Sequence, residues 1–166
     1  AFIEGEAVVY RTSWHPAGCP LIIPPEIAPD TYQIDIGTTD DQRYIGPGWH
    51  WRESFGGLTA RWTGAGGAQP TLYLDLPPGA YTVTVTAQAF QQAQELTLRV
   101  NGEVVETVTI TPETLADYTL TIPAAVIGEG VNLAVELDHG PPTEVAPGQR
   151  QLGLLVDGIV FSQDTP

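Results

Sequence analysis

The feature that most constrains the fold is a series of short segments, from residue 71 to residue 161, in which apolar and polar residues alternate. A period of two places apolar side chains on one face of a strand and polar side chains on the other. Gly, Pro or Asn separates the segments at short intervals, which is typical of an antiparallel sandwich or barrel. The expected strands lie at 31–37, 57–64, 71–76, 79–90, 95–110, 117–123, 131–137 and 152–161.

Two local signals refine this pattern. Asn101-Gly102 divides the segment 95–110 and predicts a tight hairpin, because both residues tolerate positive φ. Thr111 followed by Pro112 resembles a helix start, so we expect one short helical turn at 111–117.

The N-terminal third lacks such periodicity. Residues 12–30 contain five prolines and predict an irregular surface excursion. Cys19 is the only cysteine, so it forms no disulfide within the chain, and we expect a partly buried, inert thiol rather than a metal pair with His15. Residues 38–53 are expected to form a long ordered loop between two strands.

The charge of the chain limits its partners. Twenty acidic residues stand against six basic ones, for a net charge of −14, which argues against nucleic acid and against an anionic membrane surface. The charge either serves solubility or gathers carboxylates around a hard cation such as calcium. The sequence contains no apolar run long enough to span a membrane and no signal peptide. It also lacks methionine, so we expect residues 1–166 to be a single domain cut from a longer protein.

Several segments resemble carbohydrate-binding modules of the galactose-binding-like jelly-roll type. "FIEGEAVVY" (2–10) and "GLLVDGIVF" (153–161) are similar to the first and last strands of such modules. "LPPGAYTVTVTAQA" (76–89), "LTLRVNGEVV" (96–105) and "IGEGVNLAVEL" (127–137) are similar to the middle of the family. The resemblance implies a jelly roll of about eight to ten antiparallel strands that binds carbohydrate.

A second, narrower resemblance concerns "IDIGTTDDQRYIGPGWHWRE" (34–53), "TARWTG" (59–64) and "RQLGLLVDGIVF" (150–161). These segments look like an extracytoplasmic β-domain attached to multi-spanning membrane proteins of the glycosyltransferase type that uses lipid-linked sugars. This resemblance implies a location outside the cytoplasmic membrane, with no membrane insertion by this segment itself.

The first candidate site joins Glu4, Glu6 and Asp157. Glu4 and Glu6 would face the same side of a strand, and pairing of the first and last strands would bring Asp157 near them. By the family resemblance these residues would hold a structural calcium ion. The alternative is that both glutamates are solvated edge residues and that Asp157 caps a turn.

The second candidate site gathers the aromatic residues of the loop with nearby polar groups: Trp49, Trp51, Tyr44, Asp40, Asp41 and Arg52. Sugars present C–H faces that pack on aromatic rings and hydroxyls that need fixed polar neighbours. The competing interpretation is that the tryptophans only anchor the loop to the core. If a sugar binds, we expect one tryptophan to be left uncovered, with Asp40 and Asp41 at the surface near Arg43 or Arg52.

The remaining arginines are interpreted as partners of carboxylates. We expect Arg52, Arg61 and Arg150 to order the acidic loop, with Arg150 near Asp35 or Asp41, and Trp62 to lie in the core with Arg61 pointing away from it. No motif of a nucleophilic or metal-dependent enzyme occurs, so we predict a non-catalytic domain. The alternative function is a structural or protein-interaction β-sandwich that binds no sugar.

Overall fold

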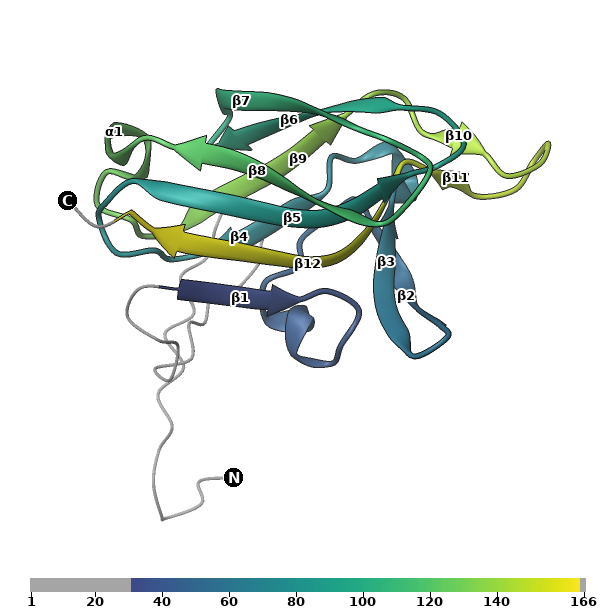
Figure 1. Cartoon of the computed structure of the whole chain (residues 1–166), viewed down its shortest axis with the longest axis horizontal. Helices are drawn as coiled ribbons and strands as arrows, with labels where there is room; N and C mark the ends of the chain where they lie inside the picture. The colour runs from purple at the N-terminus through teal and green to yellow at the C-terminus, as the bar shows by residue number, and fades with distance from the viewer. Residues whose placement is uncertain (1–30, 165–166) are drawn as a thin grey trace, which may run out of the picture.

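The computed structural model describes residues 31–164, which form two antiparallel sheets packed against each other (Figure 1). The larger sheet contains β1 (Thr31–Asp35), β2 (Trp49–Phe55), β3 (Leu58–Thr63), β5 (Tyr81–Ala89), β8 (Ala116–Ile122) and β12 (Leu154–Gln163). The smaller sheet contains β4 (Thr71–Leu74), β6 (Gln94–Val100), β7 (Glu103–Ile110) and β9 (Leu133–His139). The predicted all-β sandwich is confirmed.

Shorter elements complete the described chain. A two-stranded ribbon pairs β10 (Thr143–Glu144) with β11 (Gln151–Leu152). The helical pieces are η1 (Asp40–Arg43), η2 (Ala65–Gly67) and α1 (Ala124–Ile127). Within residues 31–164, none of these helices has the length and apolar character needed to cross a bilayer. The earlier candidates Glu4, Glu6, His15 and Cys19 lie outside the described residues.

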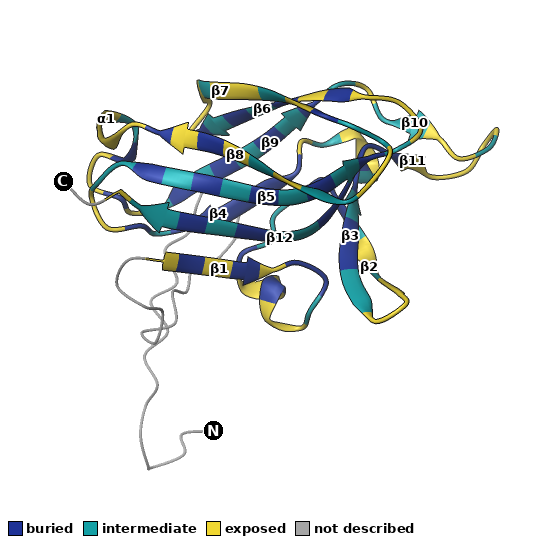
Figure 2. Cartoon of the chain, in the orientation of Figure 1, coloured by how far each residue is buried: buried dark blue, intermediate teal, exposed yellow. Residues whose placement is uncertain are grey.

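The core lies between the sheets, where the alternating strands turn their apolar sides inward (Figure 2). Along β5, Tyr81, Val83 and Val85 are fully buried, whereas the threonines between them are partly exposed on the outer face. Burying one such large apolar side chain stabilises the fold by about 1.5–3 kcal/mol. The period of two seen in the sequence is therefore the period of burial in the structure.

The β6–β7 hairpin turns at Asn101-Gly102, as predicted. The two residues have φ angles of 52° and 82°. The left-handed region is accessible to Asn and Gly at low steric cost, which explains why this dipeptide ends β6 so sharply.

The predicted helical turn at 111–117 is wrong. The backbone carbonyl of Thr111 accepts a hydrogen bond from Ala89 N–H, and Thr111 N–H donates to the Tyr118 hydroxyl. Both backbone groups of Thr111 therefore have partners outside a helix, and β8 begins at Ala116. The only described α-helical segment is α1, which lies further along the chain.

The strand β12 organises the edge where the candidate site lies. One side of β12 pairs with β5, and the other side pairs first with β3 and then with β1. The change of partner coincides with a bulge at Asp157, whose carbonyl accepts a hydrogen bond from Ile36 N–H. Residues 36–48 connect β1 to β2 at this position, so this connection is fixed next to the central strand β12.

Candidate functional site

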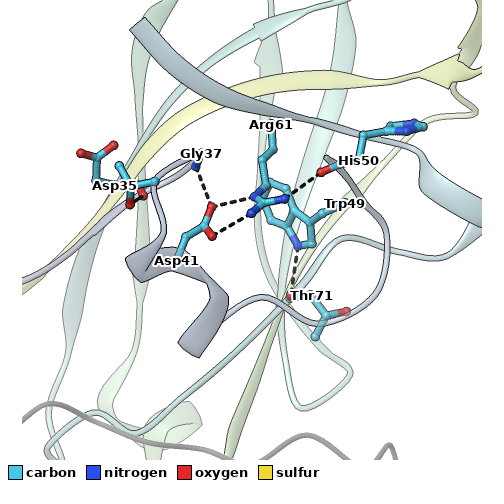
Figure 3. A network of polar contacts seen from close by, with 8 residues as sticks. Asp35, Gly37, Asp41, Trp49, His50, Arg61 and Thr71 are labelled. Carbon is cyan, nitrogen blue, oxygen red and sulfur yellow. Dashed lines mark hydrogen bonds and ion pairs between the residues drawn. The ribbon is translucent and has the colours of Figure 1, made fainter. Parts of the chain in front are cut away.

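A buried ion pair between Asp41 and Arg61 holds the connection between β1 and β2 in place (Figure 3). Asp41 is 1% exposed. Arg61 donates from Nε to Asp41 Oδ2 at 2.6 Å and from Nη2 to Oδ1 at 2.9 Å. Gly37 N–H donates to the same Oδ2 at 2.6 Å, so three donors satisfy one carboxylate. Bidentate, charge-assisted contacts of this kind offset the desolvation cost of burying a carboxylate.

Gly37 allows this arrangement because the chain passes very close to β3. A Cβ at Gly37 would lie 2.4 Å from the backbone nitrogen of Ala60, and its φ is +97°. Both restrictions require glycine. The expected surface position of Asp41 is therefore wrong, and the physical reason is Arg61, which turns inward from β3 and compensates the buried charge.

Trp49 anchors the start of β2. Its side chain is 9% exposed, and its Nε1–H donates to the carbonyl of Thr71 at 3.0 Å. Gly46 N–H donates to the same carbonyl at 2.8 Å, and Thr71 N–H donates to Pro47 O. Tyr44 is also buried, so residues 44–49 are fixed against β4 by both apolar packing and backbone hydrogen bonds. The expectation of an ordered, anchored segment is confirmed.

Trp51 has the opposite environment and is 83% exposed. The register between β2 and β3 shifts between Trp49 and Arg52, so an extra residue on β2 interrupts the alternation. The bulge explains why two tryptophans spaced two residues apart do not share one environment. The expected loop at 38–53 is corrected only at its end, residues 49–53, because β2 begins at Trp49.

The side chain of Trp51 borders a shallow hollow of about 450 Å³, which we call the Trp51 hollow. The residues that line it are Trp49, His50, Trp51, Arg61, Ala65 and Gly66. Arg61 also donates from Nη1 to His50 O at 3.0 Å, which links the wall of the hollow to the buried ion pair (Figure 3). An exposed indole thus stands beside a rigid polar and aromatic surface.

Other predicted site residues lie apart from Trp51. Tyr44, Asp40 and Asp41 line a second hollow of about 350 Å³ together with Asp35 and Arg43. Burial raises the pKa of Tyr44 above its usual value of 10.0. Arg52 is exposed and is not among the lining residues of either hollow. The structure therefore divides the predicted set in two, with the Asp41–Arg61 pair between the parts.

The ribbon β10–β11 is tied to β2 by polar contacts. Arg150 forms an ion pair with Glu53, which raises the pKa of Arg150, so the expected pairing of Arg150 with Asp35 or Asp41 is wrong. The His50 ring lies 2.8 Å from the Gln151 carbonyl, measured from Nε2. No periodicity in the sequence predicts that residues 150–151 contact β2, because this contact depends on the tertiary path of the ribbon.

Trp62 also differs from expectation. It is half-buried, and its ring meets Phe90 edge to face at 5.5 Å between centroids. Arg61, expected to point away from the core, is 6% exposed. Arg61 is buried against the alternation expected for β3 because its guanidinium pairs with the buried carboxylate of Asp41.

Asp157, the described member of the predicted calcium site, is half-buried on the bulge of β12. Burial, followed by the negative charges of Asp35 and Asp117, raises the pKa of Asp157 above its usual 3.8. Among residues 31–164, no three acidic, histidine or cysteine side chains are grouped closely enough to hold a metal ion.

The architecture matches solved sugar-binding jelly rolls. The CBM22-1 xylan-binding domain from Paenibacillus barcinonensis Xyn10C superposes with a TM-score of 0.53 at 12% identity, covering 82% of this chain and 94% of that chain. The fold is the jelly roll of carbohydrate-binding modules. The CBM36-1 domain of a multidomain xylanase from the hindgut metagenome of Trinervitermes trinervoides gives a TM-score of 0.51 at 14% identity, covering 82% of this chain and all of that domain.

A larger enzyme contains the same jelly roll as one part. The Podospora anserina GH26-CBM35 β-(1,4)-mannanase has a TM-score of 0.52 at 10% identity, and the match covers 84% of this chain but 29% of the mannanase chain. The sequence itself matches no family model and no curated protein. At these identities the likeness establishes the jelly roll alone.

Proposed function

We propose that this chain is a non-catalytic carbohydrate-binding module in which Trp51 is the platform for a sugar ring. The observation that carries the proposal is the 83% exposure of Trp51 beside the Trp51 hollow. Leaving an indole in water forgoes about 1.5–3 kcal/mol of burial, so a conspicuously exposed tryptophan on an ordered strand favours a binding role. The jelly-roll fold, shared with domains that bind xylan, supports sugar as the ligand.

The neighbours of Trp51 suit a neutral sugar. The indole face packs against C–H groups, while His50 and the backbone around Ala65 and Gly66 supply polar edges for hydroxyls. Arg61 lines the hollow, but each of its three guanidinium nitrogens already donates to Asp41 or to His50 O and its charge is paired with Asp41, so it strengthens the wall rather than recruiting an anion. The contact area is small and aromatic, as expected for recognition of one or two sugar units.

The proposal assigns no catalytic step. Glycoside hydrolysis needs a pair of carboxyl groups free to exchange protons or attack the sugar. Asp41, which is bonded to the lining residue Arg61, is held by three donors and is buried, so it is poorly placed for either role. Binding alone is the chemistry that the site supports.

The second candidate function is a protein-interaction domain without affinity for sugar. The observation that favours it is Phe55, which is 43% exposed at the end of β2, on the hairpin that projects from the large sheet (Figure 1). Trp51 and Phe55 together would offer a partner two aromatic anchors.

The test is a glycan array followed by calorimetric titration with xylo-oligosaccharides, using wild type, Trp51→Ala and Phe55→Ala. Phe55→Ala is the matched control, because it removes an exposed aromatic ring from the same strand without altering the lining of the hollow. Removing an aromatic anchor costs about 2 kcal/mol of binding free energy, so Trp51→Ala should bind about thirtyfold more weakly, whereas Phe55→Ala should bind like wild type. A wild type silent on the array contradicts the proposal. If both variants lose affinity equally, and for a protein ligand rather than for a sugar, the result supports the protein-interaction domain.

We further propose that the module lies outside the cytoplasmic membrane as part of a larger protein of the membrane glycosyltransferase type. The support is the resemblance of residues 34–53 and 150–161 to such extracytoplasmic domains, and the acidic composition, which suits solvent exposure. Proteolysis of intact cells, with detection of the residue 31–164 domain in the released fraction, tests this location. Protection from the protease until lysis would contradict it.

Calcium remains the proposed structural ion. Burial, followed by the negative charges of Asp35 and Asp117, raises the pKa of Asp157, and a cation would offset the repulsion from those two carboxylates. Glu4 and Glu6 would complete the ligands together with Asp157. Calcium would supply charge neutralisation between strands rather than chemistry on the sugar.

A further inference from the structure

The second hollow, of about 350 Å³, lies where β1 leads into η1, and we call it the Tyr44 hollow. The hydroxyl of Thr38 donates to Asp35 O, which closes the turn between β1 and η1. This turn brings Asp35 and Asp40 to one hollow although they lie on different elements. The volume is near the lower end for ligand pockets and suits a small ligand.

The charged side chains at the rim of the Tyr44 hollow are not paired with one another. Asp35, Asp40 and Arg43 are exposed, and none of them belongs to an ion pair formed among residues 31–164. Asp41 also lines the hollow, but its charge is compensated by Arg61. The Asp35 side chain is turned away from this buried pair (Figure 3). Two carboxylates and one guanidinium therefore leave an excess of negative charge at the rim.

Tyr44 adds a buried polar group without a partner. It is 8% exposed, and its ring packs in the core. Its hydroxyl forms no hydrogen bond within residues 31–164, whereas the buried hydroxyl of Tyr81 donates to Pro77 O. Burial raises the pKa of Tyr44, and the charges of Arg43 and Asp40 act on the same hydroxyl. Because both of these side chains line the hollow, the hydroxyl lies at its wall.

An unpaired hydroxyl on a buried side chain is destabilising, and such groups in native proteins are usually satisfied by a partner. The backbone holds this hydroxyl in place. Tyr44 N–H and Ile45 N–H both donate to Asp41 O, and Tyr44 O accepts from Tyr73 N–H. Asp41 is fixed in turn by its ion pair with Arg61. A ligand would therefore have to order only the exposed side chains around a preformed hydroxyl.

We propose that the Tyr44 hollow is a second binding site, which takes a protonated amino sugar. An amino sugar carries an ammonium group next to a hydroxyl group. Asp35 and Asp40 accept hydrogen bonds from the ammonium, while Arg43 and the Tyr44 hydroxyl bind the neighbouring hydroxyl. The negative excess at the rim and the chain charge of −14 attract a cation. The site does not involve Trp51, so it stands or falls separately from the proposed function.

The experiment titrates ¹⁵N-labelled Trp51→Ala protein, which lacks the Trp51 platform, and follows the backbone amides of residues 36–44 and the Arg43 Nε–H by NMR. The two main probes are protonated glucosamine and N-acetylglucosamine, which differ in the charge on nitrogen. We expect saturable shifts with glucosamine and a response about tenfold weaker with N-acetylglucosamine. Equal responses to both sugars, or no response to glucosamine at concentrations on the order of 100 mM, would overturn the proposal.

Two further probes define the source of the ammonium group. Shifts with glucosamine but not with its β-1,4-linked trisaccharide identify a free monosaccharide, and shifts with both identify a sugar chain. Nα-acetyl-lysinamide presents an ammonium group without hydroxyls. A response to it as strong as that to glucosamine would refute the sugar assignment and indicate a lysine side chain of a protein partner instead.

Variants in the same background locate the site. Tyr44→Phe removes only the unpartnered hydroxyl, so it should keep the melting temperature and bind glucosamine about tenfold more weakly. Asp40→Asn should reduce the preference for glucosamine over N-acetylglucosamine. Glu103→Gln is the matched control for charge, because Glu103 is exposed on β7 in the other sheet, and it should bind like the parent protein. Unchanged binding in Tyr44→Phe, or an equal loss in Glu103→Gln and Asp40→Asn, would contradict a site in this hollow.

Discussion

Asp41→Asn tests whether the buried pair with Arg61 supports the fold. In wild type, the carboxylate receives two hydrogen bonds from Arg61 and one from Gly37 N–H. The amide nitrogen of asparagine cannot accept, and Arg61, 6% exposed, loses its counter-charge. Breaking a buried pair by changing one partner costs about 3–5 kcal/mol. At roughly 2–4 °C per kcal/mol for a chain of this size, the melting temperature should fall by about 6–20 °C.

The assay is urea unfolding followed by tryptophan fluorescence, with the free energy of unfolding extrapolated to water. Glu53→Gln is the matched control, because its partner Arg150 is 45% exposed at the side chain and an exposed pair contributes about 0–1 kcal/mol. The double variant Asp41→Asn with Arg61→Met should lose less stability than the two single losses combined. A loss below about 1 kcal/mol in Asp41→Asn, or strict additivity in the double variant, would refute this account of the pair.

Three further predictions concern separate parts of the molecule. Trp49→Ala should lose about 3–5 kcal/mol of stability while Trp51→Ala melts like wild type, and equal melting of both variants would contradict the anchor. A chain that includes residues 1–30 should melt several degrees higher in calcium than in chelator, because a hundredfold excess of calcium over Kd stabilises the folded state by about 2.7 kcal/mol. Asp157→Asn should remove this difference, and identical melting of the wild type in both conditions would reject the ion. Because burial lowers the pKa of His139, the unfolded chain takes up the proton first as pH falls below 6.5. The free energy of unfolding should therefore decrease as the pH falls from 6.5 toward the lower pKa of His139 in the folded state. Thermal melts between pH 7 and pH 5 should show a smaller decrease in His139→Gln than in wild type.

The strands from residue 71 onward were predictable because one physical property, burial of one face, fixes both sequence and structure. β5 shows this directly, since its buried residues are the alternate apolar ones. β2 was missed because Trp49–Phe55 alternates only over its first four residues and does not alternate in burial. A usable signal was nevertheless present in Gly56-Gly57, whose φ angles of 60° and 97° form the turn between β2 and β3.

The helix prediction at 111–117 failed for the opposite reason. Thr111 and Pro112 are good local signals for a helix start, but a single turn gains too few hydrogen bonds to compete with strand pairing. The backbone of Thr111 is taken by Ala89 and Tyr118 instead. Local capping chemistry is decisive only where the following residues can bury a helical face.

The candidate site depends on contacts between residues that are distant in sequence. Through these contacts the buried pair of Asp41 and Arg61 can influence the surface around Trp51. The exposure of Trp51 follows from a bulge, which no periodicity encodes. The preceding residue, His50, makes two hydrogen bonds: its carbonyl accepts from Arg61, and its ring bonds to the Gln151 carbonyl. The backbone beside Trp51 is therefore ordered before a ligand arrives, and binding has to immobilise little more than the indole, at about 0.5–1.5 kcal/mol. Asp41→Asn frees Arg61 from its main partner, so it should weaken sugar binding in addition to stability, although Asp41 does not line the Trp51 hollow.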